Sequence, residues 1–283
     1  MSLIVRFDAC PICGSSDLAP SFVYDTPPEG ETKFDFGETP YQRFYRVCER
    51  CGHFSSNSDM DLSALYDGAY VDATYSDADG IRRTFEKIIG LPSERSDNTG
   101  RVACIEAFRS THSAWDGKEA PSCLDVGSGL AVFPYAMRLA GWRCTALDPD
   151  QRAAEHARSV AGVEAITADF LEAEPGSLGR HDLVSFNKVL EHVVDPIDML
   201  RRTHSCLAPD GVVYVELPDG EGAADDGPGR EEFFIEHHHV FSLASLALLA
   251  VAAGFRVLSL ERIREPSTKF TLRAFLEAAP DQQ

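Results

Sequence analysis

The stretch that decides the fold is Leu124-Asp125-Val126-Gly127-Ser128-Gly129, a short apolar run that ends in two glycines. Glycines at the end of a strand let the backbone approach a ligand at the start of the next helix. A dinucleotide-binding loop would place a third glycine where this sequence has Val132. Asp125, two residues before Gly127, would repel a phosphate but suits a positively charged amino group. The stretch therefore predicts a nucleotide-like ligand without a pyrophosphate.

Two further acidic residues follow at the ends of the next two predicted strands. Asp148 lies 19 residues after Gly129, where a carboxylate can accept hydrogen bonds from both hydroxyl groups of a ribose. Asp169 ends the third strand and can meet the amino group of an adenine, with Phe170 beside the ring. A nucleoside with a cationic, phosphate-free tail is S-adenosylmethionine (SAM). These residues therefore predict a site for that methyl donor.

Strands and helices alternate from Ser122 onward, which predicts a sheet with helices on both faces. The last two predicted strands leave no room for a helix between them, so they form an antiparallel hairpin at one edge. The predicted fold is an α/β, doubly wound, seven-stranded Rossmann-like sheet that is mostly parallel. Strands are predicted over 122–129, 143–150, 163–170, 181–193, 211–219, 256–263 and 269–278, and helices over 130–142, 150–160, 195–211 and 242–255.

Four of the eight cysteines form two CxxCG pairs near the N-terminus, Cys10 with Cys13 and Cys48 with Cys51. Four thiolates at two turns predict a tetrahedral, structural Zn²⁺ site in a small zinc-ribbon-like module that needs the metal to fold. His53 in place of one thiolate, and two hairpins with incidental cysteines, are the alternatives. The other four cysteines lie in apolar patterns, which favours reduced and buried side chains.

Charge and hydropathy restrict the partners. The chain of 283 residues has 45 acidic and 26 basic side chains, and its formal charge of −19 repels the phosphates of DNA and RNA. No apolar run approaches the length of a membrane span, and the N-terminus lacks the apolar segment of a secretion signal. We therefore expect a cytoplasmic protein with a small-molecule substrate and with neither nucleic-acid nor membrane partners.

Five motifs, in order, resemble those of the class I SAM-dependent methyltransferases. They are LDVGSG, LDPD, ADF, FNKVLEHVVDP and LAPDGVVYVELPD, and the resemblance covers residues 122–277. It implies an enzyme that transfers a methyl group from SAM. The residues that it assigns to the donor site are Asp125, Gly127, Gly129, Asp148, Asp169, Phe170 and Asn187.

The chain as a whole is similar to the sugar C-methyltransferases of deoxysugar biosynthesis, which continue into a further C-terminal domain. The features that carry this similarity are the four-cysteine module, the aromatic linker and the segment EHHHVFS. In that family a Glu-His pair and a loop histidine are associated with proton abstraction next to a sugar keto group; here these are Glu236, His237 and His192. We predict a zinc module over 1–60, a helical linker over 61–115 that covers the substrate, and a methyltransferase domain over 116–283.

Three adjacent histidines, His237-His238-His239, allow several hypotheses. A purification tag is excluded because the triplet is short and lies inside the domain. A metal site would need His237 and His239 on one face of an extended segment plus a third ligand from elsewhere. The remaining hypotheses are a polar turn before a helix with Ser242 as its N-cap, and catalysis by His237, because histidine titrates near neutrality.

The predicted reaction is SAM-dependent methylation of a small hydroxylated or keto metabolite, with a nucleotide-linked sugar as the leading candidate. The alternatives are an O- or N-methyltransferase acting on another small molecule, a zinc-finger rRNA methyltransferase, and a non-catalytic SAM-binding module. Tyr66, Tyr70 and Tyr75 could cover the substrate pocket. The glycine-rich stretch 218–232 is a candidate lid with hinge freedom.

Overall fold

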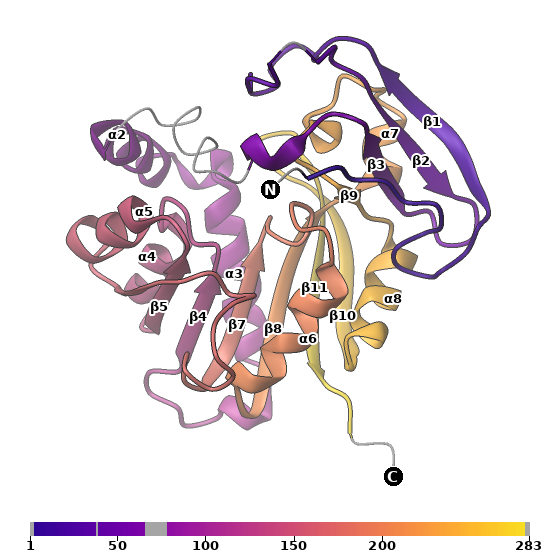
Figure 1. Ribbon diagram of the computed structural model, residues 1–283. Coiled ribbons are helices and arrows are strands. Elements are labelled where there is room, and N and C mark those ends of the chain that lie inside the picture. The colour runs from indigo at the N-terminus through magenta and orange to yellow at the C-terminus, as the bar shows by residue number, and fades with distance from the viewer. Residues whose placement is uncertain (1–2, 38, 66–77, 281–283) are drawn as a thin grey trace.

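A seven-stranded sheet forms the centre of the computed structural model, which describes residues 3–37, 39–65 and 78–280 (Figure 1). The strand order is β10-β11-β8-β7-β4-β5-β6. Strands from β8 to β6 pair in parallel, whereas β11 pairs antiparallel with β8 and β10, so the predicted fold class and edge hairpin are confirmed. The strands are β4 (Ser122–Val126), β5 (Arg143–Asp148), β6 (Glu164–Thr167), β7 (His181–Asn187), β8 (Leu207–Pro218), β10 (Phe255–Arg264) and β11 (Phe270–Ala278).

The order of these strands places the ligand site. The chain builds β4, β5 and β6 toward one edge of the sheet, then returns to add β7 and β8 on the other side of β4. Open α/β sheets bind ligands outside the carboxyl ends of the strands at such a reversal of order. The residues that follow β4, β5 and β7 are therefore expected to form the site.

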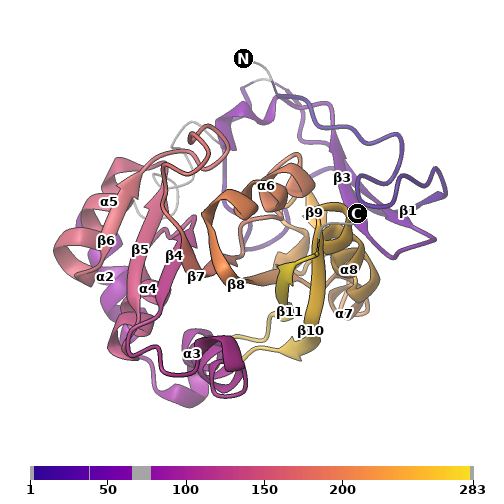
Figure 2. The same cartoon turned by 90° about the horizontal axis from the view of Figure 1, so that it is seen from below.

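Helices cover both faces of the sheet, with α3 and α6 on opposite sides (Figure 2). On one face Leu124 packs in a core with Leu200 of α6 and Leu246 of α8, and on the other Cys123 packs with Met137 of α4. Within the described ranges no helix is long and apolar enough to cross a membrane. The helices are α2 (Ala78–Ile89), α3 (Asp97–Arg109), α4 (Val132–Leu139), α5 (Gln151–His156), α6 (Pro196–Arg202), α7 (Gly220–Ala224) and α8 (Leu243–Ala252).

The predicted helix over 195–211 is shorter than expected. It begins at the N-cap Asp195, but α6 ends at Arg202, and Leu207 already belongs to β8. Ala208 precedes Pro209, and a residue before proline is disfavoured in the helical conformation. The chain tightens into a 3-10 helix over Thr203–Cys206 after α6, and it has left the helical conformation before Pro209.

The prediction of a hinged lid over 218–232 is wrong in its first part. Residues Gly220–Ala224 form helix α7, and a Cβ added at Gly220 would lie 2.6 Å from Cδ2 of Phe54. Glycine at position 220 thus permits close packing against the N-terminal region. It is a packing residue and not a hinge.

A second, four-stranded sheet joins the N-terminal region to the methyltransferase fold. Strands β1 (Leu18–Tyr24), β2 (Arg43–Cys48) and β3 (Phe54–Ser58) take their fourth strand, β9 (His239–Val240), from the histidine segment. Figure 1 shows this sheet beside the upper end of the central sheet. A domain boundary at residue 60, as predicted, therefore places β3 and its partner strand β9 in different domains. The two parts of the chain share a sheet.

Glu216 of β8 is a fully buried acid in a charged network between the sheet and α3. Its carboxylate accepts hydrogen bonds from Tyr214, from Arg273 of β11 and from Arg101 of α3. Burial alone would raise the pKa of Glu216, but Arg101 and Arg273 hold it at about 2. The network ties the linker helix α3 to the central sheet.

We expect the free energy of unfolding to fall in acid because of Glu216. Its pKa in the folded chain lies below the unfolded value of about 4.3, so its contribution is complete above that pH and disappears as the pH falls toward 2. A contribution on the order of 3 kcal/mol corresponds to such a shift. Urea unfolding of the wild type and of Glu216→Gln at steps from pH 6 to pH 3 tests this. The difference between the two should shrink as the pH falls, and a constant difference would contradict the assignment.

Candidate active site and zinc centre

The glycine loop after β4 turns sharply toward α4. Gly127 has φ +69°, and its amide donates to the carbonyl oxygen of Leu147 of β5 at 2.8 Å. A Cβ at Gly127 would also lie 2.8 Å from Cγ2 of Val189. Both the backbone conformation and the close approach of Val189 therefore require glycine here.

Asp125 and Asn187, both assigned to the donor site by the resemblance, meet beside this loop. One Asp125 oxygen accepts from Oγ of Ser185 and from Nδ2 of Asn187, each at 2.8 Å. Burial raises the pKa of Asp125 to about 6. Oδ1 of Asn187 is buried and has no hydrogen-bond partner in the part of the chain that the structure describes. A buried carboxylate beside an unused amide oxygen fits the positively charged amino group of a SAM-like ligand.

Asp148 stands at the end of β5, across the loop from Asp125. Its two carboxylate oxygens accept from the backbone amides of Gly129 at 2.8 Å and of Asp150 at 2.9 Å. These bonds orient the carboxylate and leave each oxygen capacity for another donor. A Cβ added at Gly129 would meet no atom of the described residues within 4 Å, which leaves open space beside the loop among them. This geometry fits a ribose with two hydroxyl groups.

Asp169 and Phe170 lie farther out, after β6. Asp169 is exposed, and its carboxylate accepts from the amide of Leu171 at 2.8 Å. The ring of Phe170 is buried and packs edge-on against Phe186 of β7, with ring centroids 5.7 Å apart. The structure thus brings the glycines, Asp125, Asp148 and Asn187 together, while Phe170 lies in the core beneath the carboxyl edge. The contact of Asp169 and Phe170 with adenine stays a prediction.

His192 and His237 come together from segments far apart in the sequence. Their ring centroids are 4.9 Å apart, and the ring planes make an angle of 62°. Nδ1 of His192 lies 2.9 Å from the carbonyl oxygen of Glu236, and Nδ1 of His237 lies 2.8 Å from that of Glu232. A carbonyl can only accept, so in the neutral ring each Nδ1 carries the hydrogen and Nε2 keeps a lone pair. Both imidazoles are therefore held in the tautomer in which Nε2 is a base.

The pKa of His237 supports the same role. Burial, followed by the neighbouring His192, lowers it well below its ordinary value, so the ring is neutral near pH 7. Glu236, the other predicted catalytic residue, is partly buried, and one of its oxygens has no hydrogen-bond partner among the described residues. Burial raises the pKa of Glu236. Its side chain is thus available to a substrate, while its backbone orients His192.

The remaining histidines of the triplet have structural surroundings. His238 is fully buried. His239 is also buried, with Nδ1 3.1 Å from Nε2 of His53 and Nε2 3.2 Å from the carbonyl oxygen of Val194. The metal hypothesis needs His237 and His239 as joint ligands, whereas His237 groups with Glu191 and His192, and His239 contacts His53. The predicted N-cap Ser242 is confirmed, since its side chain accepts from the amide of Ser245 at 2.9 Å.

The N-terminal sheet anchors the segment that carries His237. The hydroxyl of Tyr45 donates to the carbonyl oxygen of His237 at 2.6 Å. Glu31, paired with the fully buried Arg43 at 2.7 Å, accepts from the amide of Ile235, also at 2.7 Å. Sequence reasoning missed Glu31, Arg43 and Tyr45, because nothing in their spacing connects them to a segment almost two hundred residues later.

Lys188 and Glu191 are two further residues that sequence reasoning did not assign to the site. Lys188 follows Asn187 with φ +60°, a left-handed conformation that is uncommon for a residue with a side chain. Its amino group donates to the hydroxyl of Thr271 at 2.9 Å. Glu191 lies beside His192 and His237, with one ligand-type atom of each residue within 4.8 Å of the others. The strained backbone at Lys188 marks this turn as a functional region.

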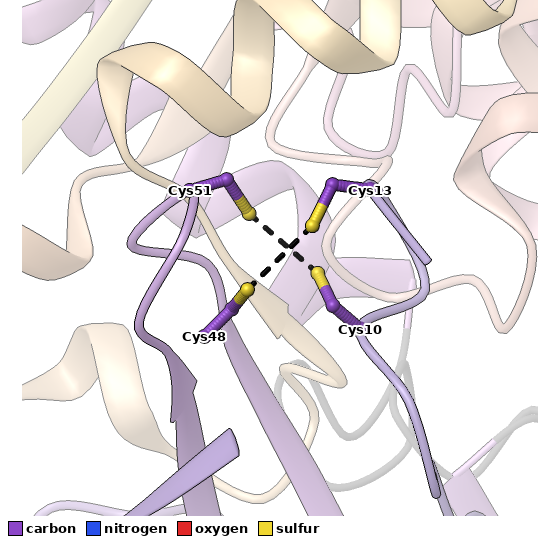
Figure 3. A group of neighbouring side chains, drawn as sticks. All are labelled: Cys10, Cys13, Cys48 and Cys51. Atoms are coloured by element: carbon purple, nitrogen blue, oxygen red, sulfur yellow. Dashed lines mark hydrogen bonds between the residues drawn. The ribbon is translucent and has the colours of Figure 1, made fainter. Parts of the chain in front are cut away.

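The four predicted cysteines converge on one point (Figure 3). Sγ of Cys10 lies 3.6 Å from Sγ of Cys51, the same distance separates Cys13 from Cys48, and all four sulfurs lie within 4.8 Å of one another. With a Zn–S bond of about 2.3 Å, a tetrahedral zinc site separates its sulfurs by about 3.8 Å. The four thiolates therefore fit Zn²⁺, and His53 points to His239 instead.

Tyr66, Tyr70 and Tyr75, the tyrosines considered as a cover of the substrate pocket, lie outside the described residues.

The fold is that of the class I SAM-dependent methyltransferases, as the sequence motifs predict. A family model described as a methyltransferase domain matches residues 99–260, so the chain belongs to that family and is an enzyme, a methyltransferase. Among solved structures, the 1,6-didemethyltoxoflavin-N1-methyltransferase of Burkholderia thailandensis has a similar fold, with a TM-score of 0.54. The alignment, at 20% identity, covers 81% of this chain and 96% of that one.

Two curated relatives represent different methyl acceptors. The C-methyltransferase NovU of Streptomyces niveus is 28% identical over 268 residues, which are 91% of this chain and 58% of NovU. The ubiquinone biosynthesis O-methyltransferase of Caulobacter vibrioides is 34% identical over 104 residues, 34% of this chain and 40% of that enzyme. The chain thus spans little more than half the length of the first relative, and its similarity to the second is confined to part of the domain.

Proposed function

We propose that this enzyme transfers the methyl group of SAM to a carbon atom of a small keto or hydroxylated metabolite, with a nucleotide-linked sugar as the leading candidate. The observation that carries the proposal is the pair His192 and His237, whose basic Nε2 atoms are fixed by two backbone carbonyls. The similarity to a C-methyltransferase over 91% of the chain supports it. The carbon next to a keto group becomes a nucleophile only after it loses a proton, and a fixed imidazole supplies the base.

The reaction would proceed in two linked events. Nε2 of His237 accepts the proton from the acceptor carbon, and the electrons of the C–H bond remain as an enolate. SAM, when bound, supplies a sulfonium methyl group to this carbon, and the electrons of the broken C–S bond stay on sulfur. Asp125, Asn187 and Asp148 would hold the donor, so that the protein mainly contributes positioning. Glu236 would bind a hydroxyl group of the acceptor.

The proposal also assigns roles to the four cysteines and to the N-terminal parts of the chain. Four cysteines would hold a structural Zn²⁺ that has no open position for catalysis. In this proposal the chain divides into a zinc module over 1–60, a linker over 61–115 and a methyltransferase domain over 116–283. The first two parts would cover the bound substrate. The charge of −19 favours a small-molecule acceptor over rRNA.

O-methylation is the second candidate, because the domain is also similar to an O-methyltransferase. The same histidine could remove a proton from a hydroxyl group, so the site geometry serves both reactions. The product distinguishes them: a new C–CH₃ signal in the NMR spectrum of the methylated acceptor supports the first candidate. A methoxy signal supports the second.

The donor site is tested by Asp148→Ala, for which we expect a Kd for SAM about 10-fold to 100-fold higher. The replacement removes hydrogen bonds to a charged acceptor, each worth about 1.5–3 kcal/mol. Isothermal titration with SAM and with S-adenosylhomocysteine measures the change. Asp116→Ala serves as the control, because Asp116 is exposed and precedes β4 at the opposite edge of the sheet. Equal affinity of Asp148→Ala and the wild type would remove Asp148 from the donor site.

A further inference from the structure

Glu191 is a buried acid whose carboxylate makes no hydrogen bond to the described residues. Its side chain is fully buried, and neither carboxylate oxygen has a hydrogen-bond partner among the described residues. Its backbone carbonyl accepts from the amides of His238 at 2.8 Å and His239 at 3.2 Å. A buried carboxylate without such partners is costly, because it loses its hydration and gains nothing in return. A group retained at that cost is a candidate for function.

The surroundings of Glu191 are basic. One oxygen of Glu191, one nitrogen of His192 and one nitrogen of His237 lie within 4.8 Å of one another. Lys188, from the same turn, is a positive group whose charge acts on Glu191. Glu191 is therefore an acidic member of a cluster that contains both candidate bases.

Charged groups from neighbouring elements also act on this cluster. Glu216 of β8 acts on Glu191, and Lys269, just before β11, acts on His237. Burial raises the pKa of Glu191, which His192 and Lys188 partly offset, whereas burial and His192 lower the pKa of His237. Burial thus disfavours the charged form of each group, and a proton on His237 needs a negative charge nearby. The carboxylate of Glu191, with an oxygen within 4.8 Å of a nitrogen of His237, can supply that charge.

We propose that Glu191 is a positioning residue whose carboxylate stabilises the imidazolium that forms when His237 accepts a proton from the acceptor. This inference rests on the proposed function, because it assumes that His237 is the base. The C–H bond breaks, its electron pair remains on the acceptor, and a new N–H bond forms at Nε2 of His237. The positive charge then faces the carboxylate of Glu191. The proton leaves to solvent after the methylated product departs.

The test is Glu191→Gln, a replacement of nearly the same shape without the charge. We expect the pKa of His237, followed by NMR of histidine-labelled protein, to fall by about one unit or more, which corresponds to about 1.4 kcal/mol. Turnover should fall at least tenfold, and the acidic limb of its pH profile should move to lower pH. Glu191→Asp keeps the negative charge, so the pKa of His237 should stay close to its wild-type value. The Tm should not fall, because the variant buries one unpaired charge fewer.

The control for the histidine titration, and not for turnover, is Glu236→Gln, which removes a different carboxylate of the same region and should leave the pKa of His237 unchanged. Unchanged histidine titration in Glu191→Gln would overturn the inference, as would a lower Tm with an unchanged pH profile. A second zinc per chain, present in the wild type and lost in Glu191→Gln, would also overturn it by making Glu191 a metal ligand. The NMR titration needs no acceptor. A failure to find a methylated product would therefore count against the proposed function and leave this result intact.

Discussion

Replacement of His237 by alanine is expected to lower turnover by about 10²-fold to 10⁴-fold, the range that a general base contributes. The variant removes the only imidazole that would accept the proton of the acceptor in the proposed reaction. It leaves Asp125, Asn187 and Asp148 in place on the other strands, so the Kd for S-adenosylhomocysteine should not change. Turnover is measured with an acceptor found by screening nucleotide-linked keto sugars. The Kd for S-adenosylhomocysteine is measured by calorimetry.

The control for this prediction is His112→Ala. His112 is also partly buried and stacks on Phe108 at 5.0 Å, but it follows α3 and precedes β4. Its loss should cost some stability and leave turnover near the wild type. If His237→Ala retains wild-type turnover, the base is elsewhere. His192→Ala then becomes the decisive variant, because its Nε2 is fixed in the same manner.

Replacement of Cys48 by serine is expected to abolish the proposed zinc binding and to lower the Tm by on the order of 10 °C or more. Structural zinc contributes about 10–16 kcal/mol of apparent binding free energy in zinc-finger peptides, and this energy is coupled to folding. Cys10, Cys48 and Cys51 lie in the same hydrophobic core as α8, so the damage should reach the methyltransferase domain. Zinc content by elemental analysis and thermal unfolding by circular dichroism measure both effects.

Turnover should also be lost in Cys48→Ser, for a reason that the structure specifies. Cys48 ends β2, and Tyr45 of the same strand donates to the carbonyl oxygen of His237. Without the metal, β2 no longer holds the segment of the candidate base. Cys104→Ser is the matched control, because Cys104 is partly buried on α3 and lies outside the four-cysteine cluster. A zinc-free Cys48→Ser protein with wild-type Tm and turnover would refute the structural role.

Much of the fold could be predicted because its signals are local. Glycines at 127 and 129, the acid at 148 and the regular alternation of strands and helices each depend on a few neighbouring residues. The donor-site geometry follows from the strand ends, since parallel strands bring their carboxyl ends to one edge. The boundary of α6 was misjudged because the helical pattern continues in sequence past the point where Pro209 forbids it.

The rest of the site depends on contacts between distant segments, which no pattern within one segment reveals. Glu191 stands within a motif and resembles a solvated helix-start acid until its burial beside His237 is seen. Tyr45 and Glu31 are ordinary strand and loop residues until β3 pairs with β9. The histidine triplet could not be resolved for the same reason: the partner of each ring comes from a different part of the chain.

The pairing of β3 with β9 has a consequence for biosynthesis. Phe54 emerges from the ribosome long before its partner Val240. During translation β3 must therefore wait with one unpaired edge, while most of the central sheet is made. An exposed strand edge can pair with other chains. Early zinc loading at the two cysteine turns would hold the nascent N-terminal strands together until β9 arrives, so cells starved of zinc should accumulate this protein in aggregates.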